Sequence, residues 1–173
     1  SSNVKVGTEV VTSGLDDVSV KDVPIGTVDS VSDYEGNRTI LVKPYADFES
    51  PLAFEETVVA LQKELNSRGI TIFATIDHQK AAEAVGENMQ PATVLIVGNP
   101  KVGTALMQEN PRLAIELPLK ILIYKEDKTV KIRYEKIAAI AKKYDIKQNF
   151  ATAEKIDSAM QQLIKLAIGK LGN

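Results

Sequence analysis

A change in hydrophobic period at Ser50-Pro51 constrains the fold of this chain more than any other feature of its sequence. Before this point, short β-rich stretches are separated by turn residues, and the pattern predicts four short strands and no helix within residues 4–42. After it, apolar residues at helical spacing alternate with strand-like runs. We therefore expect a β-rich segment over residues 1–48 and an α+β domain over residues 49–173.

Charge and composition agree with two modules and exclude several classes of function. Residues 1–48 carry 4 basic and 8 acidic side chains, whereas residues 49–173 carry 17 and 15. The whole chain has 21 basic and 23 acidic residues, so it has no positive excess for a nucleic-acid backbone and no nucleic-acid partner is expected. The absence of cysteine excludes disulfides, thiolate metal centres and thiol nucleophiles. The apolar runs are far shorter than the roughly 20 residues that cross a bilayer, so no direct membrane insertion is expected.

In the second module, turn residues separate the predicted helices from the predicted strands. We expect helices over residues 54–68, 78–85, 101–108, 135–144 and 153–171, and strands over residues 70–76, 91–97, 120–125 and 130–134. The last two strands should form a hairpin, and Thr152 is the expected N-cap of the last helix. One face of the first strand is expected to carry the alternating residues Ile70, Ile72, Ala74 and Ile76.

Several sequence blocks in this module resemble the domain of unknown function 302 family. They are Phe54-Glu55-Glu56-Thr57, Ile76-Asp77-His78, the run from Val97 through Gly98-Asn99-Pro100-Lys101 to Met107, Asn110-Pro111 and Leu117-Pro118-Leu119-Lys120. The resemblance covers residues 46–173 and implies a TBP-like α+β fold, in which helices back an antiparallel sheet. It also implies a homodimer, and it brings no established reaction. Ala53 stands where the family has a capping residue, so the first helix begins with a weaker cap or shifts towards Ser50.

Three blocks of the first module resemble part of the β-barrel of the rod-shape-determining protein MreC. They are Val6 to Leu15, Val23 to Val28 and Val42 to Phe48. The resemblance implies a small all-β appendage with a role in bacterial cell shape, although the coiled coil, the anchor and the rest of the barrel are not in this chain. It implies an extracytoplasmic location, whereas the second module implies a cytoplasmic one. The chain begins without methionine, which leaves an upstream anchor and the localisation open.

His78 is the only histidine, and it follows Asp77 directly. An imidazole beside a carboxylate is suited to binding zinc or to transferring protons, so His78 is a candidate metal ligand and the pair is a candidate catalytic centre. The alternative is structural, because Asp77 stands where the N-cap of the following helix is expected.

A second candidate site surrounds the Gly98-Asn99-Pro100-Lys101 block. A glycine turn that opens a helix exposes amide donors, so Asn99 and Lys101 are candidates for binding an anion or a small ligand. Glu116 and Lys120 flank Leu117-Pro118 and would add charge to such a pocket. The alternatives are turn and packing chemistry for the glycine block, and solvated strand ends for the two charged residues.

The sequence therefore favours a binding or regulatory module, with a site for a small ligand, an anion or a metal near His78 and Asn99. The alternatives are an enzyme of unknown reaction that uses His78 and Asp77, and a structural component of the cell-shape machinery. No motif of nucleophilic catalysis is present and the balance is against an enzyme; no cofactor is expected. A homodimer is expected, because Leu166 and Ile168 add apolar positions beside the stripe of the last helix, which is Ile156, Met160, Leu163, Ile164, Ala167 and Leu171.

Overall fold

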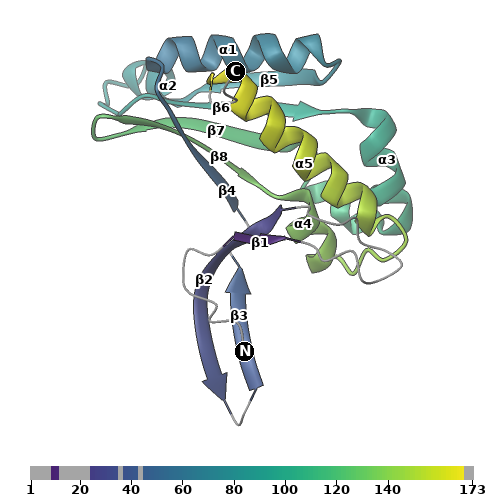
Figure 1. Ribbon diagram of the computed structural model, residues 1–173. Helices are drawn as coiled ribbons and strands as arrows, with labels where there is room; N and C mark the ends of the chain where they lie inside the picture. The colour runs from purple at the N-terminus through teal and green to yellow at the C-terminus, as the bar shows by residue number, and fades with distance from the viewer. Residues whose placement is uncertain (1–8, 12–23, 35–36, 43–44, 170–173) are drawn as a thin grey trace.

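The computed structural model describes residues 9–11, 24–34, 37–42 and 45–169. These residues form two sheets, a three-stranded one with the order β1-β2-β3 and a five-stranded one with the order β4-β8-β7-β6-β5. Neighbouring strands are antiparallel throughout both sheets. Helices back the larger sheet (Figure 1), so the predicted α+β class is confirmed.

The smaller sheet contains β1 (Glu9–Val11), β2 (Pro24–Tyr34) and β3 (Asn37–Val42). The larger sheet contains β4 (Tyr45–Ser50), β5 (Thr71–Asp77), β6 (Ala92–Gly98), β7 (Leu119–Glu126) and β8 (Thr129–Glu135). The helices are α1 (Phe54–Ser67), α2 (His78–Glu83), α3 (Pro100–Glu109), a short 3-10 helix η1 (Pro111–Ile115), α4 (Ile137–Lys143) and α5 (Phe150–Ala167).

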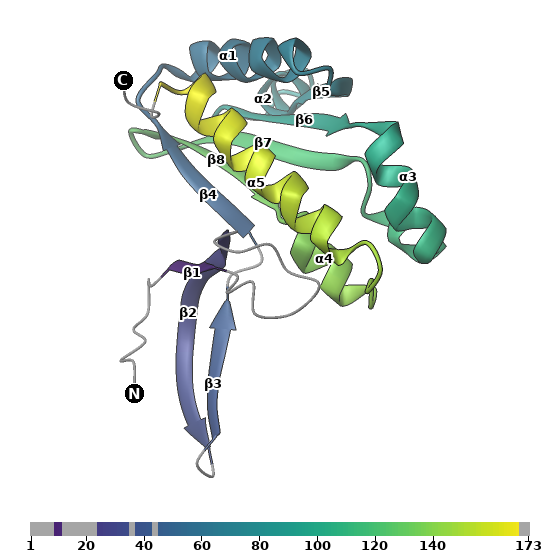
Figure 2. The same ribbon diagram turned by 45° about the vertical axis from the view of Figure 1, so that its right-hand side comes forward.

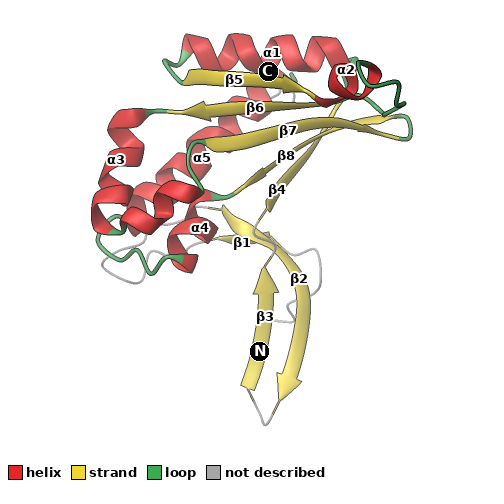
Figure 3. Ribbon diagram, turned by 180° about the vertical axis from the view of Figure 1, so that it is seen from behind, coloured by secondary structure: helices red, strands yellow, loops and turns green. Residues whose placement is uncertain are grey.

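One face of the five-stranded sheet is covered and the other is open. Helix α5 crosses the covered face diagonally, and α1 runs along its β5 edge (Figure 2). Along β7 the side chains alternate, so that Leu119, Ile121 and Ile123 are buried while Lys120 and Leu122 are not. Figure 3 shows the open face of the sheet. On this side, none of the described helices covers β7 or β8. The hydrophobic core therefore lies between this sheet and α1, α4 and α5.

The hairpin predicted near the end of the sheet is confirmed. Strands β7 and β8 pair from Ile121 with Tyr134 to Glu126 with Thr129. Asp127, in the turn, has a positive φ of 52°, a conformation in which aspartate is more common than most residues. The sequence predicts this hairpin because a short turn joins an apolar run, Ile121 to Tyr124, to an alternating strand.

The described part of the N-terminal segment contains three strands, where the sequence predicts four. Strand β2 is longer than expected, because its residues after Val28 continue to pair with β3 as far as Tyr34. Val28 is only 1% exposed, and β2 contacts α5 of the larger module. Strand β4 crosses the expected boundary at residues 48 and 49, and all six of its residues pair with β8.

The expected face of β5 is wrong, because a bulge at Phe73 interrupts its alternation. Ile72 lies opposite Val97, whereas Ala74 lies opposite Ile96. Val97 is fully buried on the helix side and Ile96 is on the other side, so Ile72 and Ala74 face opposite ways. An extra residue in one strand shifts the side-chain period by one position, and a single-strand pattern does not show this.

The expected N-cap is correct for α2 and wrong for α5. The side chain of Asp77 accepts a hydrogen bond from the Lys80 amide at 3.0 Å, as expected of a cap. Helix α5 begins at Phe150, so Thr152 lies within its first turn and donates its amide to the Asn149 carbonyl. Helix α1 does begin after Ala53, whose amide donates to the Glu56 carboxylate at 3.2 Å.

Glu109, the last residue of α3, binds the segment that leads into α5. Its carboxylate accepts from the amides of Lys147, Gln148 and Asn149 at 2.6, 2.9 and 3.0 Å, and from the Asn149 side chain at 2.9 Å. These donors, foremost the Lys147 amide, lower the pKa of Glu109 from 4.5 to about 2. The carboxylate therefore joins the end of α3 to the start of α5.

Asp157 of α5 caps a second helix from the side. Its two carboxylate oxygens accept from the amides of Ile137 and Ala138, each at 2.8 Å, in the first turn of α4. Burial raises the pKa of Asp157 to about 6, and the negative charge of Glu154 adds to the rise. The two amides and the positive charge of Lys136 lower the pKa but do not outweigh burial. Helices α3, α4 and α5 are thus held together by two carboxylates.

We predict that Glu109→Gln lowers the urea midpoint of unfolding at neutral pH, because an amide cannot accept from all four donors. The folded pKa is depressed, so the stabilisation is fully present above pH 4.5 and is lost as the pH falls through about 2. The difference between wild type and variant should therefore shrink over this interval. The matched control is Glu83→Gln on the exposed surface of α2, and a midpoint change as large in the control contradicts the prediction.

Asp157→Asn should show the opposite dependence on pH. The folded pKa is raised, so the contribution of Asp157 to stability is greatest below pH 3.8 and decreases as the pH rises through about 6. Relative to the asparagine variant, the wild-type protein should lose free energy of unfolding over this interval, which urea titrations at a series of pH values measure. A difference that stays constant from pH 4 to pH 7 contradicts the account.

Candidate functional site

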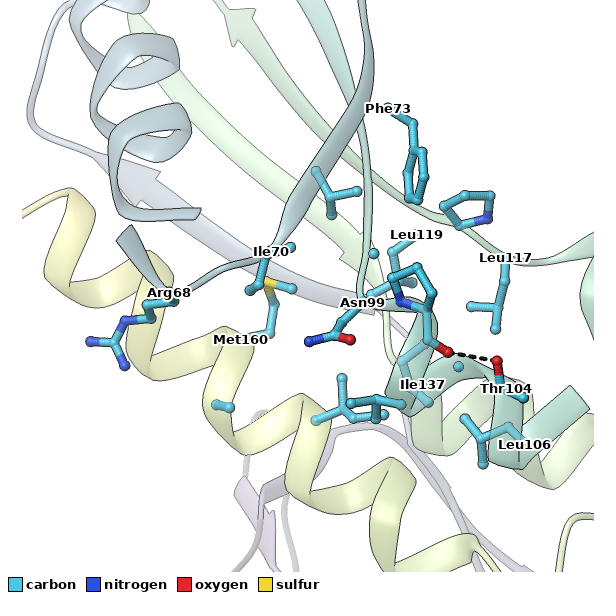
Figure 4. Close-up of a pocket in the computed structure, with 18 of the residues that line it drawn as sticks. Arg68, Ile70, Phe73, Asn99, Thr104, Leu106, Leu117, Leu119, Ile137 and Met160 are labelled. Atoms are coloured by element: carbon cyan, nitrogen blue, oxygen red, sulfur yellow. Dashed lines mark hydrogen bonds between the residues drawn. The ribbon is translucent and has the colours of Figure 1, made fainter. Parts of the chain in front are cut away.

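An apolar pocket opens at the end of the larger sheet, between α3 and α5 (Figure 4). Its volume is about 440 Å³. Its walls come from the end of α1, from β5 and β6, from α3, from the segment before β7 and from α4 and α5. The lining residues are Arg68, Ile70, Phe73, Val97, Gly98, Asn99, Pro100, Val102, Gly103, Thr104, Leu106, Met107, Leu117, Pro118, Leu119, Ile137, Ile156, Ala159, Met160 and Leu163.

The turn from β6 into α3 forms one wall. Asn99 is the N-cap of α3, and its side-chain oxygen accepts from the Lys101 amide at 3.1 Å. Pro100 follows at the first helical position, where its missing amide hydrogen costs nothing. Gly98 allows a close approach, because a Cβ there would lie 3.3 Å from the ring of Phe73. The bulge in β5 and this glycine together place Phe73 in the wall of the pocket.

The floor of the pocket is apolar and buried. Leu106 of α3, Ile137 of α4 and Leu163 of α5 are each at most 3% exposed. Gly103 leaves space beside them, since a Cβ at this position would meet Leu117 at 3.5 Å and Met107 at 3.9 Å. The shape of the pocket therefore depends on how α3 and α5 are held, and the Glu109 carboxylate fixes their separation at one end.

Polar groups are confined to the mouth. Arg68 and Asn99 are exposed there, and the Arg68 side chain is paired through Nε with Glu64 at 2.8 Å. The hydroxyl of Thr104 donates to the Pro100 carbonyl at 2.6 Å. In Figure 4 the Asn99 amide points towards the side where Met160 and Arg68 lie, while Phe73 and Leu117 lie on the other side. The site thus has an apolar interior, and its polar side chains lie apart, with Arg68 and Thr104 on opposite sides of Asn99 (Figure 4).

Of the six candidate residues predicted from the sequence, only Asn99 lines this pocket. Lys101 and Lys120 are exposed outside it. Glu116 is committed elsewhere, because it accepts from Lys143 at 2.6 Å and from the Tyr144 hydroxyl at 2.8 Å. These two donors lower the pKa of Glu116.

His78 and Asp77 lie at the other end of β5. Asp77 pairs with Thr93 at the start of β6, whereas Asn99 follows the end of β6, so the structure does not bring His78 and Asn99 into one site. His78 is exposed at the start of α2. The Lys80 amide, more than any other group, lowers the pKa of Asp77. The described residues contain no group of three or more histidine, aspartate or glutamate side chains able to hold a metal.

Sequence reasoning missed most of the pocket. Arg68, Met107 and Met160 line the pocket, and none of them is among the site candidates that the sequence predicts. The local signal was present only at Asn99 and Pro100, because the other walls come from segments far apart in the chain.

No helix in the described parts of the chain is long and apolar enough to span a membrane.

Comparisons with known proteins give separate matches for the N-terminal segment and for the rest of the chain. The sequence pattern of the rod shape-determining protein MreC barrel core matches residues 1–52, so the N-terminal resemblance is confirmed. Proteins named fluoride-specific ion channel FluC 1, from Brucella suis biovar 1 and Brucella abortus biovar 1, are 27% identical over 100 residues. That match covers 58% of this chain and only 39% and 37% of those relatives.

A solved structure shares the fold of the second module. It is the crystal structure of an uncharacterized conserved DUF302 protein from Bacillus stearothermophilus, with a TM-score of 0.61 and 17% sequence identity. The similarity covers 76% of this chain and 100% of that one. The sequence pattern described as domain of unknown function DUF302 matches residues 46–165, more than half of the chain. The chain therefore belongs to the DUF302 family.

Proposed function

We propose that this protein is a binding module that holds a small, largely apolar molecule in the pocket between α3 and α5. The observation that carries the proposal is the pocket itself, with its volume of about 440 Å³ and its apolar lining. Sites for small molecules are typically concave and mostly apolar, with a few polar groups that orient the ligand. This pocket has that composition, since its polar side chains, Arg68, Asn99 and Thr104, all lie at exposed positions.

The pocket is also an energetic exception within the fold. Protein interiors pack densely. Burying apolar surface stabilises a protein by about 25 cal/mol per Å², and surface left in contact with water lacks this stabilisation. Leucine and methionine side chains from α3 and α5 would fill the space if the helices moved together. The Glu109 contacts and the wall at Phe73 oppose this movement, so a ligand is the simplest way to cover the apolar surface.

The two alternatives have weaker support. An enzyme using His78 and Asp77 would need a free carboxylate beside the ring, whereas the Asp77 carboxylate accepts from the Lys80 amide and pairs with its ammonium group at 3.3 Å. A structural role in cell shape rests on the match of residues 1–52 to the MreC barrel core. That match concerns a different part of the chain from the pocket, so it is compatible with ligand binding.

We also propose a two-fold dimer, formed through the open face of the larger sheet. Ile76 is 42% exposed on this face, and Val94, Ile96 and Leu122 are partly exposed beside it. The argument from α5 is weaker than the sequence suggested, because Ile168 is buried and only Leu166 of that pair is exposed. The apolar part of this face, on β5, β6 and β7, is a surface of the kind that two-fold dimers bury, and Arg133 of β8 lies opposite Leu122 at its margin.

The binding proposal predicts that a neutral apolar fluorophore, N-phenyl-1-naphthylamine, binds saturably with one site per chain. Ala159→Phe should abolish this binding, because residue 159 is exposed on α5 and a benzyl group there would project into the pocket. Gly103→Leu should do the same from α3. The matched control, Ala114→Phe, adds the same group at an exposed position outside the lining and should bind like wild type. Fluorescence titration measures binding of the fluorophore, and thermal melts show whether each variant is folded. If the pocket variants are well folded and bind the fluorophore as tightly as wild type, the proposal is contradicted.

The dimer proposal predicts a mass near twice 18.8 kDa by light scattering at micromolar concentration. Leu122→Lys should give the monomer mass, because it places a charge in the middle of the open face. Leu166→Lys, on the exposed side of α5, is the control and should remain dimeric. A wild-type mass near 18.8 kDa, or dissociation by the control variant alone, contradicts this interface.

A further inference from the structure

We propose that the ligand of this pocket is a single-chain amphiphile with one anionic head group, a carboxylate or a phosphate monoester. Its apolar chain lies between α3 and α5, and its head lies at the mouth, on the side of Asn99 where Arg68 lies (Figure 4). This inference rests on the proposed binding function and specifies the chemistry of its ligand.

The first argument is the kind of polar group that the mouth leaves for a ligand. The oxygen of the Asn99 amide is used by the Lys101 amide, so its nitrogen is the atom left to donate. Arg68 uses Nε for Glu64, which leaves the two terminal nitrogens of its guanidinium group. The hydrogen of the Thr104 hydroxyl is used by the Pro100 carbonyl. The mouth therefore offers chiefly hydrogen-bond donors, which select a ligand with acceptors.

The second argument is charge. Arg68 is the only charged residue among the described residues that line the pocket. Glu64 offsets part of this charge, but the pair is exposed, with the Arg68 side chain 43% accessible, and such pairs are weak. A planar guanidinium group can bind one carboxylate through Nε and a second anion through its terminal nitrogens. An anionic head is therefore favoured over a neutral one, and a cationic head is disfavoured.

The third argument fixes the orientation of the ligand. Beyond the mouth the lining is apolar, and Leu106, Leu119 and Leu163 are at most 6% exposed. A charged head moved into this region would be buried without partners, which is costly. An unbranched apolar chain fits there, because Met107 and Met160 have flexible side chains that adapt to its shape. The head therefore stays at the Arg68 end and the chain points inward.

Asn99→Asp is the sharpest variant, because it changes the mouth and keeps the fold. An aspartate still accepts from the Lys101 amide and still caps α3, but it replaces the free donor by a negatively charged oxygen. Arg68→Gln removes the positive charge and breaks only an exposed ion pair. Lys101→Gln is the matched control, since Lys101 is an exposed cation beside the mouth that does not line the pocket.

The test is titration calorimetry of the full chain with four probes that share a decyl-length chain: decanoate, decyl phosphate, decan-1-ol and decyltrimethylammonium. The charged probes are used below their micellar concentrations. We expect at least one anion to bind about tenfold more tightly than the alcohol, as one charge-assisted hydrogen bond would give. The tighter anion identifies the head group. Asn99→Asp and Arg68→Gln should remove this preference, whereas Lys101→Gln should keep it.

The outcomes separate this inference from the binding function on which it rests. If the anions, the alcohol and the cation bind equally, and Ala159→Phe abolishes all binding, the anionic head is wrong and the binding function stands. If no probe binds, or if Ala159→Phe changes nothing, the binding function fails and the inference fails with it. Loss of the preference in Lys101→Gln but not in Arg68→Gln also overturns the head-group assignment.

Discussion

The carboxylate of Glu109 holds the end of α3 against the start of α5, and the pocket depends on this contact. Four donors converge on it, three of them backbone amides that precede α5 and lack partners within that helix. The interaction therefore fixes the segment before α5 and positions that helix against α3. Because α3 and α5 are opposite walls of the pocket, the same contact that stabilises the helices keeps the space between them open.

The open face of the sheet and the pocket are separate apolar surfaces with different geometry. The face is a flat array of side chains on β5, β6 and β7, which suits a second flat surface. The pocket is concave and has hydrogen-bond donors at its mouth, which suits a small molecule. Under the two proposals, a dimer formed through the sheet face would leave the pocket free, because the two surfaces are separate.

Local patterns predicted what is local in this fold. The β7–β8 hairpin and the cap at Asp77 depend on a few neighbouring residues, so the sequence alone predicts them. The bulge at Phe73 depends on the register with β6, and the start of α5 depends on a glutamate 40 positions earlier, so neither is visible locally. The same reason explains how much of the site could be predicted. Asn99 is predicted from its glycine turn, whereas Arg68 and Met160 join it in the lining of one pocket only after folding.

Photolabelling with a decanoate that carries a diazirine at the end of its chain tests the central claim most directly. If the pocket is the binding site, mass spectrometry should place the label on floor residues such as Leu106, Met107 and Leu163, and unlabelled decanoate should compete. Ala159→Phe should remove the label. Labelling of Ile76, Ile96 and Leu122 on the open sheet face, unaffected by Ala159→Phe, would contradict the account.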